Sequence, residues 1–499
     1  MKLTVLPNPI ERLNVELLII PLFENCLSDK LIKKIDKPLQ GSFKAKVAKK
    51  LFTAKHGELC SLDTIGQFKF QQLLFIGLGS KLDLTEDRLR RAAGIAMNWV
   101  KNQKVKKFAI ELRNNSYNKI KTKELTQYIT EGLILSDYSF DQFKSDKSSK
   151  ITREGSLLLS TSAQKEGSIG VKRGVAIGES VNYARDLGNL PSNIATPRYI
   201  AEQASKLGRQ SKKLKATILD EAKCKALKMG GLIAVSQGSK EPAKFIILEW
   251  LNSGSKSANP IVIVGKGVTF DTGGISIKPS ANMEEMKFDM SGAGAVIATM
   301  KAISSLNLKT DVVAIAPVTE NMPSSTAIKP GDLVTSLSKV TMEVINTDAE
   351  GRLILSDALA YASLNYKPKF VVDIATLTGA CMVALGKFAS GLFSNDDQLA
   401  AKLEKAGKVS GEITWRLPLS DEYAPEIKSS VADIKNVGSR YGGAITAALF
   451  LSRHTKERWA HIDIAGCASN DAARHYLPTG SAGYGVRILL AFIENEMNA

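Results

Sequence analysis

The sequence predicts an α/β protein of two domains, residues 1–170 and 171–499, the larger of which has a mostly parallel central sheet. Short runs of β-branched and other apolar residues recur along the chain and alternate with amphipathic helical stretches. The 499 residues, 44% of them hydrophobic, can bury the cores of more than one domain. Apolar strands separated by helices are typical of a sheet that is covered on both faces.

The first domain shows this alternation within its first 140 residues. Three apolar runs predict strands, and Lys-rich amphipathic stretches between them predict crossover helices; the strands are expected at 17–22, 73–77 and 107–112. From Phe140 to about Gly170 the sequence is polar and charged, with only the short apolar run 157–159 inside it. We interpret this stretch as a linker and place the domain boundary near 165–175.

The second domain begins with an expected helix at 174–187. Five strand candidates follow, each rich in Val, Ile, Leu or Phe, at 245–248, 261–264, 312–315, 370–374 and 461–464. Helical patterns separate these candidates, which favours a parallel sheet with helices on both faces.

The charge of the chain is basic and uneven. Lys and Arg exceed Asp and Glu by 67 to 50, and residues 1–170 carry +11 of the net +17, from 29 basic and 18 acidic residues. Such a balance favours attraction to polyanions such as nucleic acid, and solubility explains it equally well.

Composition also excludes several classes of protein. The five cysteines are odd in number and form no C-x-x-C pair, which argues against a disulfide framework and a zinc ribbon, and the four histidines form no H-E-x-x-H motif. No apolar run approaches the roughly 18 to 20 residues that span a bilayer, and the N-terminus lacks the pattern of a signal peptide. We therefore expect a soluble, cytoplasmic protein without membrane partners, in which any metal is held mostly by oxygen.

The first polar motif is the glycine-rich segment 265–274, which directly follows the strand candidate 261–264. It places Lys266 and Asp271 just past the carboxyl end of a buried strand, where open α/β sheets bind their ligands. The order of residues is not that of a phosphate-binding P-loop. A polar strand-to-helix turn remains the alternative interpretation.

Two further motifs carry charged residues. Lys278 follows the first motif, and Asp289 precedes a Gly- and Ala-rich helix, where a carboxylate is costly unless it is paired, coordinates a cation or serves the helix N-terminus. The segment 346–353 contains Asp348, Glu350 and Arg352. If it is extended, these three side chains point to one side, whereas Thr347 and Glu350 also fit a helix capping box.

Together the motifs bring four carboxylates and three cations to loops beside neighbouring strands. Four carboxylates in one pocket would repel one another strongly, and divalent ions would neutralise them. Two metal ions bridged by carboxylates are the usual arrangement for activating water and polarising a carbonyl group. A dinuclear phosphoesterase is disfavoured because such sites generally include His ligands, and these motifs contain none.

The motifs also carry a resemblance to a known family. Asn346-Thr347-Asp348-Ala349-Glu350-Gly351-Arg352-Leu353 matches in full the signature octapeptide of the leucyl aminopeptidases of the M17 family, also called cytosol aminopeptidases. Segments 265–279, 286–290, 376–380, 433–436 and 459–466 match in order and spacing. The resemblance is strong over 175–499. It implies an α/β, macro-like N-terminal domain followed by the catalytic domain.

The resemblance implies two divalent ions, Mn²⁺ or Zn²⁺ or Mg²⁺, and assigns residues to them. The tighter ion would be held by Lys266, Asp271, Asp289 and Glu350, and the exchangeable ion by Asp271, Asp348 and Glu350. Lys278 would stay protonated and stabilise the oxygen that develops negative charge. Arg352 would bind a bicarbonate ion that serves as general base.

The resemblance also implies a substrate and an assembly. The substrate would be a peptide with a free N-terminus, whose first side chain, leucine or another apolar one, enters a pocket lined by Met286, Thr376, Gly379, Ala465 and Ala468. The backbone of Leu377 would contact the substrate. The assembly would be a homohexamer, a dimer of trimers. Some relatives bind DNA, so the basic first domain makes DNA binding a candidate second function, and a DNA-binding hexamer with a vestigial peptidase site is the alternative.

Overall fold

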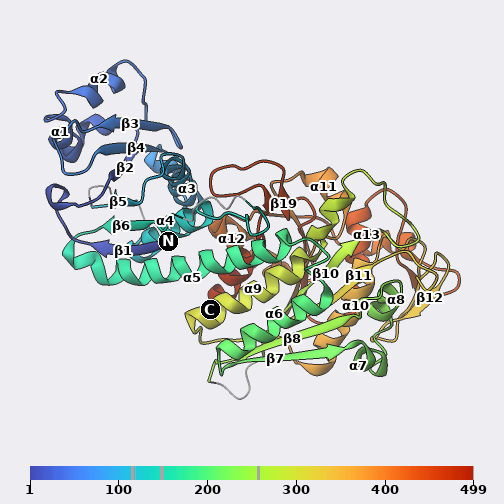
Figure 1. The fold of residues 1–499 in the computed structure, drawn as a ribbon. Coiled ribbons are helices and arrows are strands. Elements are labelled where there is room, and N and C mark those ends of the chain that lie inside the picture. The colour runs from blue at the N-terminus through green and yellow to red at the C-terminus, as the bar shows by residue number, and fades with distance from the viewer. Residues whose placement is uncertain (114–116, 118–119, 146–150, 255–258, 498–499) are drawn as a thin grey trace. The chain divides into compact units, whose positions relative to one another are not determined.

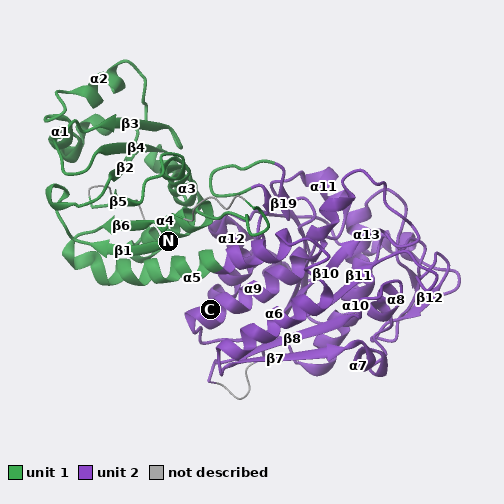
Figure 2. Ribbon diagram, viewed as in Figure 1, with its two compact units in different colours: residues 1–179, 472–478 green, residues 180–471, 479–499 purple. Residues whose placement is uncertain are grey.

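A computed structural model describes residues 1–113, 117, 120–145, 151–254 and 259–497 (Figure 1). The chain divides into two compact units, which Figure 2 colours separately. Unit 1 consists of residues 1–179 and 472–478, and unit 2 of residues 180–471 and 479–499. Each unit is built on its own sheet, so the predicted α/β class with two sheets is confirmed.

Unit 1 contains a six-stranded sheet. In spatial order its strands are β1 (Lys2–Leu6), β6 (Glu154–Leu158), β5 (Lys107–Glu111), β2 (Leu17–Phe23), β4 (Gln72–Gly79) and β3 (Leu59–Asp63). Neighbouring strands are parallel except β3 and β4. The strands predicted at 17–22, 73–77 and 107–112 are confirmed as β2, β4 and β5.

Helices cover both faces of this sheet. Successive side chains of a strand point to opposite faces, so the apolar residues of β2 pack against helices on both sides. Leu18 and Ile20 share a core with residues of α1 (Lys30–Asp36) and α2 (Ser42–Ala48). Leu17 and Ile19 share a second core with residues of α3 (Glu86–Asn102) and α4 (Thr122–Ser136). Since β2 is buried on both faces, its sequence is continuously apolar.

The stretch expected to be a linker contains regular structure. Strand β6 lies between β1 and β5, and helix α5 (Gln164–Asn189) starts well before the predicted residue 174. Leu157 and Leu158 are fully buried. The linker interpretation is therefore wrong for 154–158, because a short strand flanked by two others needs few apolar residues of its own; residues 146–150 of that stretch lie outside the described residues.

Unit 2 contains the larger sheet. Its strands, in spatial order, are β16 (Thr414–Arg416), β15 (Ser390–Ser394), β18 (Trp459–Asp463), β14 (Phe370–Ala375), β9 (Ile261–Gly265), β11 (Asp311–Asn321), β8 (Lys244–Leu251) and β7 (Leu214–Asp220), and β10 (Gly267–Asp271) also pairs with β11. The four central strands from β18 to β11 are parallel. All five predicted strands exist, but β8, predicted at 245–248, is antiparallel to β11. An apolar run carries no information about strand direction.

Helices cover both faces of this sheet as well. On one face, residues of α8 (Gly230–Ser236), α10 (Gly351–Asn365) and α13 (Gly443–Ser452) share a core with Val262 and Val264. On the other face, α9 (Ser291–Leu306) packs on β9, β11 and β14. Helix α14 (Val486–Met497) packs beside α9, and α12 (Asp397–Ser410) packs beside α14. α6 (Pro197–Gln210) packs on β7 and β8, and α7 (Glu221–Ala226) on β7.

Smaller elements complete unit 2. They are α11 (Gly379–Leu385), the three-stranded sheet of β12 (Leu333–Thr335), β13 (Thr341–Glu343) and β17 (Ile434–Lys435), and the pair β19 (Ser469–Asn470) and β20 (Gly480–Ser481). The carboxyl ends of β9, β14 and β18 meet at one edge of the large sheet, which is where parallel α/β sheets place their ligands. Among the described residues, none of the helices has the length and apolar character that a membrane span requires.

Candidate active site

Lys266 lies at a break in a strand. Both β9 and β10 pair with β11, Val264 opposite Ile315 and Gly267 opposite Val318, so the chain continues as a strand past Lys266 rather than turning into a helix. The alternative of a polar turn is therefore wrong. The Lys266 side chain is buried, and its Nζ lies 2.8 Å from Asp289 Oδ2 and 2.8 Å from Glu350 Oε1.

Two glycines make room for this lysine. A Cβ at Gly351 would lie 2.6 Å from Lys266 Cε, and one at Gly292 would lie 2.2 Å from the Ile374 carbonyl oxygen. The small residues noted in the sequence at the start of α9 are therefore required for close packing against the sheet.

Asp271 is the last residue of β10 and is buried. Its Oδ1 accepts hydrogen bonds from Asn321 Nδ2 (2.8 Å) and the Gly273 N–H (2.9 Å), and its Oδ2 lies 2.9 Å from Lys278 Nζ. The same Lys278 Nζ lies 2.5 Å from Asp348 Oδ1. Lys278 therefore joins two of the predicted metal ligands.

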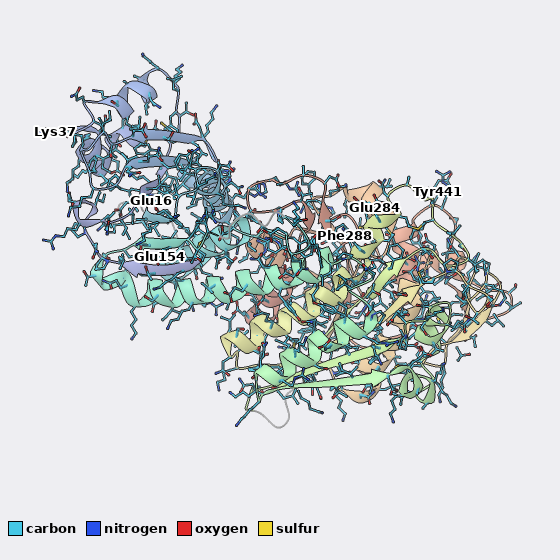
Figure 3. The ribbon with its side chains drawn as sticks, viewed as in Figure 1. Glu16, Lys37, Glu154, Glu284, Phe288 and Tyr441 are labelled. Carbon is cyan, nitrogen blue, oxygen red and sulfur yellow. The ribbon has the colours of Figure 1, made fainter. Side chains whose placement is uncertain are left out.

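Asp289 belongs to a 3-10 helix, Met283–Met290, which precedes α9; Figure 3 labels Glu284 and Phe288 of this element. The Asp289 side chain accepts a hydrogen bond from Thr376 Oγ1 (2.7 Å) and contacts Lys266. It is thus directed toward the end of β14.

The segment 346–350 forms a turn. The Asn346 side chain accepts a hydrogen bond from the Asp348 N–H (2.8 Å), and α10 begins at Gly351. Thr347 Oγ1 donates to the Gly273 carbonyl (2.6 Å), so neither the extended conformation nor the capping box is right. The turn nevertheless brings together Asp271, Asp348 and Glu350, of which one carboxylate oxygen each lies within 4.8 Å of the others.

The carboxylates of the site outnumber the cations around them. Asp289 and Glu350 share Lys266, and Asp271 and Asp348 share Lys278, with N–O distances between 2.5 and 2.9 Å. Burial raises the pKa of Asp289 to about 6, and burial together with Asp271 raises the pKa of Glu350 to about 8. The cluster therefore favours the addition of cations.

Lys266 responds in the opposite sense to its burial. Burial by itself would lower the pKa of its ammonium group, but Asp289, Glu350 and Asp271 raise that pKa above its ordinary value. As a metal ligand, Lys266 would need its neutral amine, so a metal ion would replace a proton there. Carboxylate oxygens and one amine are a donor set that suits Mn²⁺, Mg²⁺ or Zn²⁺, so the residues present fit the implied metals.

Arg352 lies in the first turn of α10. Its Nη1 donates to the Asn436 carbonyl (2.6 Å), and its buried Nε has no hydrogen-bond partner among the described residues. Burial lowers the pKa of its guanidinium group to about 10, so the group stays charged at neutral pH. A charged donor at the start of a helix is suited to binding an anion.

The charged groups open into a pocket of about 400 Å³ in unit 2. Every residue predicted for the site lines it except Glu350, which is buried beneath Lys266; the lining set includes Lys266, Asp271, Lys278, Met286, Asp289, Asp348, Arg352, Thr376, Leu377, Gly379, Ala465 and Ala468. A Cβ at Gly379 would meet no atom within 4 Å, so the pocket is open at that point.

Sequence reasoning missed three polar residues that hold these loops. Asn321, at the end of β11, donates to Asp271 Oδ1 (2.8 Å) and to the Thr347 carbonyl (3.1 Å). Asn436 and Asp463 are also buried and bonded to site loops. Asn436 and Asp463 lie within segments that match the family, and a polar residue at the end of an apolar strand was the available signal.

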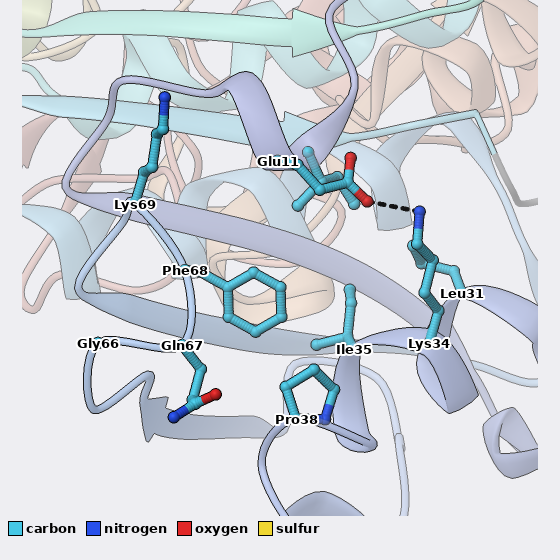
Figure 4. Close-up of a pocket in the computed structure, with 10 residues that line it drawn as sticks. Glu11, Leu31, Lys34, Ile35, Pro38, Gly66, Gln67, Phe68 and Lys69 are labelled. Atoms are coloured by element: carbon cyan, nitrogen blue, oxygen red, sulfur yellow. Dashed lines mark ion pairs between the residues drawn. The ribbon is translucent and has the colours of Figure 1, made fainter.

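A second hollow, of about 440 Å³, lies in unit 1 (Figure 4). Its lining includes Ile35 and Phe68 and the ion pair of Glu11 with Lys34. In the described part of the chain, the group of acidic, His or Cys side chains close enough to hold a metal ion is the one in unit 2. The unit 2 pocket is therefore the candidate active site.

Comparisons with known proteins agree with this location. The catalytic domain of the cytosol aminopeptidase family matches residues 182–490, and the N-terminal domain of the same family matches residues 19–147. Probable cytosol aminopeptidases of Geobacter sp. (strain M21) and Azoarcus sp. (strain BH72) are 42% and 41% identical to this chain and cover 98% and 99% of it, in each case over 98% of their own length.

Solved structures are similar over the full chain. A mutant of tomato leucine aminopeptidase superposes with a TM-score of 0.89 at 31% identity, covering 99% of this chain and 96% of its own. The bottromycin maturation enzyme BotP in complex with Mn superposes with a TM-score of 0.84 at 30% identity, covering 97% and 99%. The chain therefore belongs to the cytosol aminopeptidase (M17) family and is a metal-dependent aminopeptidase that acts on peptides.

Proposed function

We propose that this chain releases N-terminal residues with apolar side chains, leucine preferred, from peptides with a free N-terminus, using two divalent ions and bicarbonate. One observation carries the proposal. Three carboxylates, the buried Asp271 and Glu350 and the partly exposed Asp348, have oxygens within 4.8 Å of one another. They lie beside Lys266 and Asp289, at a pocket whose other wall is largely apolar.

The metal ligands are assigned as the resemblance implies. Lys266, Asp271, Asp289 and Glu350 would hold the tighter ion, and Asp271, Asp348 and Glu350 the exchangeable one. The excess of carboxylates supports this assignment, because four carboxylates share only the two lysines Lys266 and Lys278, and a further cation would relieve their repulsion. Two divalent ions supply a Lewis acid and lower the pKa of water. The Zn²⁺, Mn²⁺ and Mg²⁺ alternatives share this donor set.

Lys278 acts as the electrostatic catalyst in this proposal. It lies between Asp271 and Asp348. Burial by itself lowers the pKa of its ammonium group, but the two carboxylates raise that pKa above the ordinary value. It is therefore an ammonium group at neutral pH. Because it is partly exposed to the pocket, it can stabilise negative charge that develops on the scissile carbonyl oxygen.

Arg352 binds the bicarbonate in this proposal. None of the described residues forms a hydrogen bond with its Nε, and its charged group lines the pocket from the first turn of α10. The described pocket lining contains no histidine, so a bound anion would supply the base that abstracts a proton from water.

The side-chain pocket selects the first residue. Met286, Thr376, Leu377, Gly379 and Ala465 line it, with Ala468 beside them, and most of these present carbon atoms. The Leu377 backbone would contact the substrate. An apolar cavity of this kind favours leucine over charged side chains.

The test is hydrolysis of leucyl-anilide compared with N-acetyl-leucyl-anilide. Metal is stripped and then restored as Mn²⁺ or Zn²⁺, with and without bicarbonate. We expect cleavage of the free-amine substrate alone, restored by metal and accelerated by bicarbonate. Equal cleavage of the acetylated substrate, or no cleavage with metal bound, would contradict the proposal.

A second role in DNA binding has a specific observation in its favour. Between residues 30 and 50 unit 1 carries Lys30, Lys33, Lys34, Lys37, Lys44, Lys46, Lys49 and Lys50 against the single acid Asp36, which is buried. The test is duplex binding at increasing salt concentration, since phosphate contacts weaken steeply with salt. Replacement of four of these lysines by Gln should reduce the salt dependence.

We also propose a homohexamer located in the cytoplasm. Val383 in α11 and Phe388 just after it are 89% and 72% exposed, and large apolar side chains exposed to this extent favour burial in an assembly. Mass measurement in solution at micromolar concentration would test the hexamer, and cell fractionation the location.

A further inference from the structure

We propose that two buried side chains outside the metal and substrate sets position separate halves of the active site. Asn436 holds the loop that carries the metal ligands and Arg352, and Asp463 holds the loops that line the side-chain pocket. The inference rests on the proposed function, because the two halves are defined by it.

Asn436 follows β17 and is fully buried. Its Oδ1 accepts hydrogen bonds from the backbone N–H of Ile345 (2.8 Å) and Asn346 (3.3 Å), and its Nδ2 donates to the carbonyls of Asn346 (2.6 Å) and Ala349 (3.4 Å). Because one side chain both donates and accepts, a carboxamide fits here and a carboxylate does not.

The backbone of Asn436 extends this hold to Arg352. Its carbonyl accepts from Arg352 Nη1 (2.6 Å), and its N–H donates to the Glu343 carbonyl (2.9 Å). Asn436 is therefore bonded before, within and after the turn that carries Asp348 and Glu350. The positions of these two carboxylates depend on it.

Asp463 is the last residue of β18 and is 1% exposed. Its Oδ1 accepts the N–H of Leu377 (3.2 Å) and of Ala465 (3.1 Å), and its Oδ2 accepts the hydroxyl of Thr378 (2.7 Å). It thus joins the loop after β14 to the loop after β18. Both loops line the pocket.

Thr378 carries this connection into α11. Its Oγ1 also accepts the Cys381 N–H (3.0 Å) and so caps the helix that begins at Gly379. Asp463 therefore fixes both Ala465 and the start of α11, two walls of the pocket. A change in Asp463 should alter the width of the pocket.

Within the described residues, the side-chain hydrogen bonds of Asn436 go to the segment 345–349, and those of Asp463 go to 377–378 and Ala465. Metal affinity and side-chain selectivity should therefore be separable by mutation. A merely structural role of either residue would lower stability and leave both readouts unchanged.

The experiment compares Asn436→Asp and Asp463→Asn, which keep size and exchange acceptor and donor. For each, Mn²⁺ is titrated into metal-free protein, and the ratio of kcat/KM for leucyl-anilide over alanyl-anilide is measured at saturating Mn²⁺. Outer-sphere partners typically alter metal affinity about 10- to 100-fold. We expect Asn436→Asp to weaken Mn²⁺ binding at least about 10-fold with the ratio within about 2-fold. Asp463→Asn should change the ratio at least about 5-fold, which corresponds to about 1 kcal/mol, with Mn²⁺ affinity within about 2-fold.

Three control variants keep the test decisive. Asp357→Asn alters an equally buried carboxylate that accepts the N–H of Leu232 and Leu337, and should lower the melting temperature without moving either readout. Thr378→Val should change the ratio as Asp463→Asn does, and Thr378→Ser, which keeps the hydroxyl, should restore it.

The inference is overturned if Asn436→Asp and Asp463→Asn each move both readouts, or if neither differs from Asp357→Asn. If wild-type protein with Mn²⁺ cleaves neither anilide, the proposed function fails and the pocket half of the inference fails with it. The Mn²⁺ titrations then still decide the half that concerns Asn436.

Discussion

Units 1 and 2 are both mostly parallel sheets covered by helices, and both bury charged side chains, but they neutralise them differently. In unit 1 a buried acid has its own partner: Glu131 lies 2.5 Å from Arg90, and Asp36 accepts the N–H of Phe43 and Lys44. In unit 2 four carboxylates at the sheet edge share two lysines. A buried acid with a partner of its own stabilises the fold, whereas carboxylates that outnumber the cations around them indicate that a cation binds there.

The largest effect should come from removing the carboxylate shared by both proposed metal sites. Glu350→Ala should lose metal and reduce kcat/KM for leucyl-anilide by at least about 10⁴-fold, more than 5 kcal/mol in transition-state stabilisation. Metal content and kinetics are the measurements. Circular dichroism should match wild type, and near wild-type turnover would contradict the dinuclear assignment.

The corresponding change in unit 1 should affect stability alone. Glu131→Ala leaves Arg90 buried without its acid and should destabilise unit 1 by about 3–5 kcal/mol, while kcat/KM of the folded protein stays within about 2-fold. Differential scanning calorimetry and kinetics below the transition measure the two quantities. The double variant Arg90→Met with Glu131→Leu should recover stability. If it does not, the ion pair stabilises unit 1 by more than the cost of burying its two charges.

Lys278 distinguishes metal binding from transition-state stabilisation within unit 2. Lys278→Ala removes an ammonium group but no proposed metal ligand, so metal content should stay intact while kcat falls about 10²- to 10³-fold. Inductively coupled plasma analysis of the purified variant, with kinetics at saturating substrate, separates the two. Loss of metal together with activity would show that Lys278 serves the carboxylates rather than the reaction.

The sequence predicted the location of the site more easily than its geometry. Continuous β-branched runs predicted β9, β14 and β18, and parallel strands bring their carboxyl ends to one edge, so Lys266 after β9 and Thr376 after β14 had to converge. The turn at 346–350 could not be predicted locally, because Asn436, nearly 90 residues away, holds it.

Elements whose context is distant were also the ones that sequence reasoning missed. Strand β6 has few apolar residues of its own and depends on β1 and β5 on either side. The direction of β8 depends on its pairing with β11. Local pattern identifies an element when that element alone buries a face, and fails when neighbours supply the burial.

The smallest effect concerns a buried polar group of unit 2 that belongs to the fold. His454 is 3% exposed, and its Nδ1 lies 2.8 Å from Ser338 Oγ. In the part of the chain that the structure describes, its Nε2 has no hydrogen-bond partner. Burial lowers its pKa from 6.5 to about 3. The folded pKa lies below the unfolded one, so the contribution to stability is complete above pH 6.5 and is lost as the pH falls toward 3.

Within that window the unfolded chain binds one more proton than the folded chain at this position, which gives a slope of about 1.4 kcal/mol per pH unit. Because the unfolded histidine is already half protonated at pH 6.5, wild-type unit 2 should lose about 1.6 kcal/mol more than His454→Gln, which cannot titrate, between pH 6.5 and 5.0. Urea unfolding of both proteins in chelator at the two pH values measures the difference, since loss of metal is then common to both. Equal acid sensitivity of the two proteins would mean that folding does not lower the pKa of His454, so that its ring is charged at pH 5.0. Its Nε2 would then need an anion, as the carboxylates of the active site need cations.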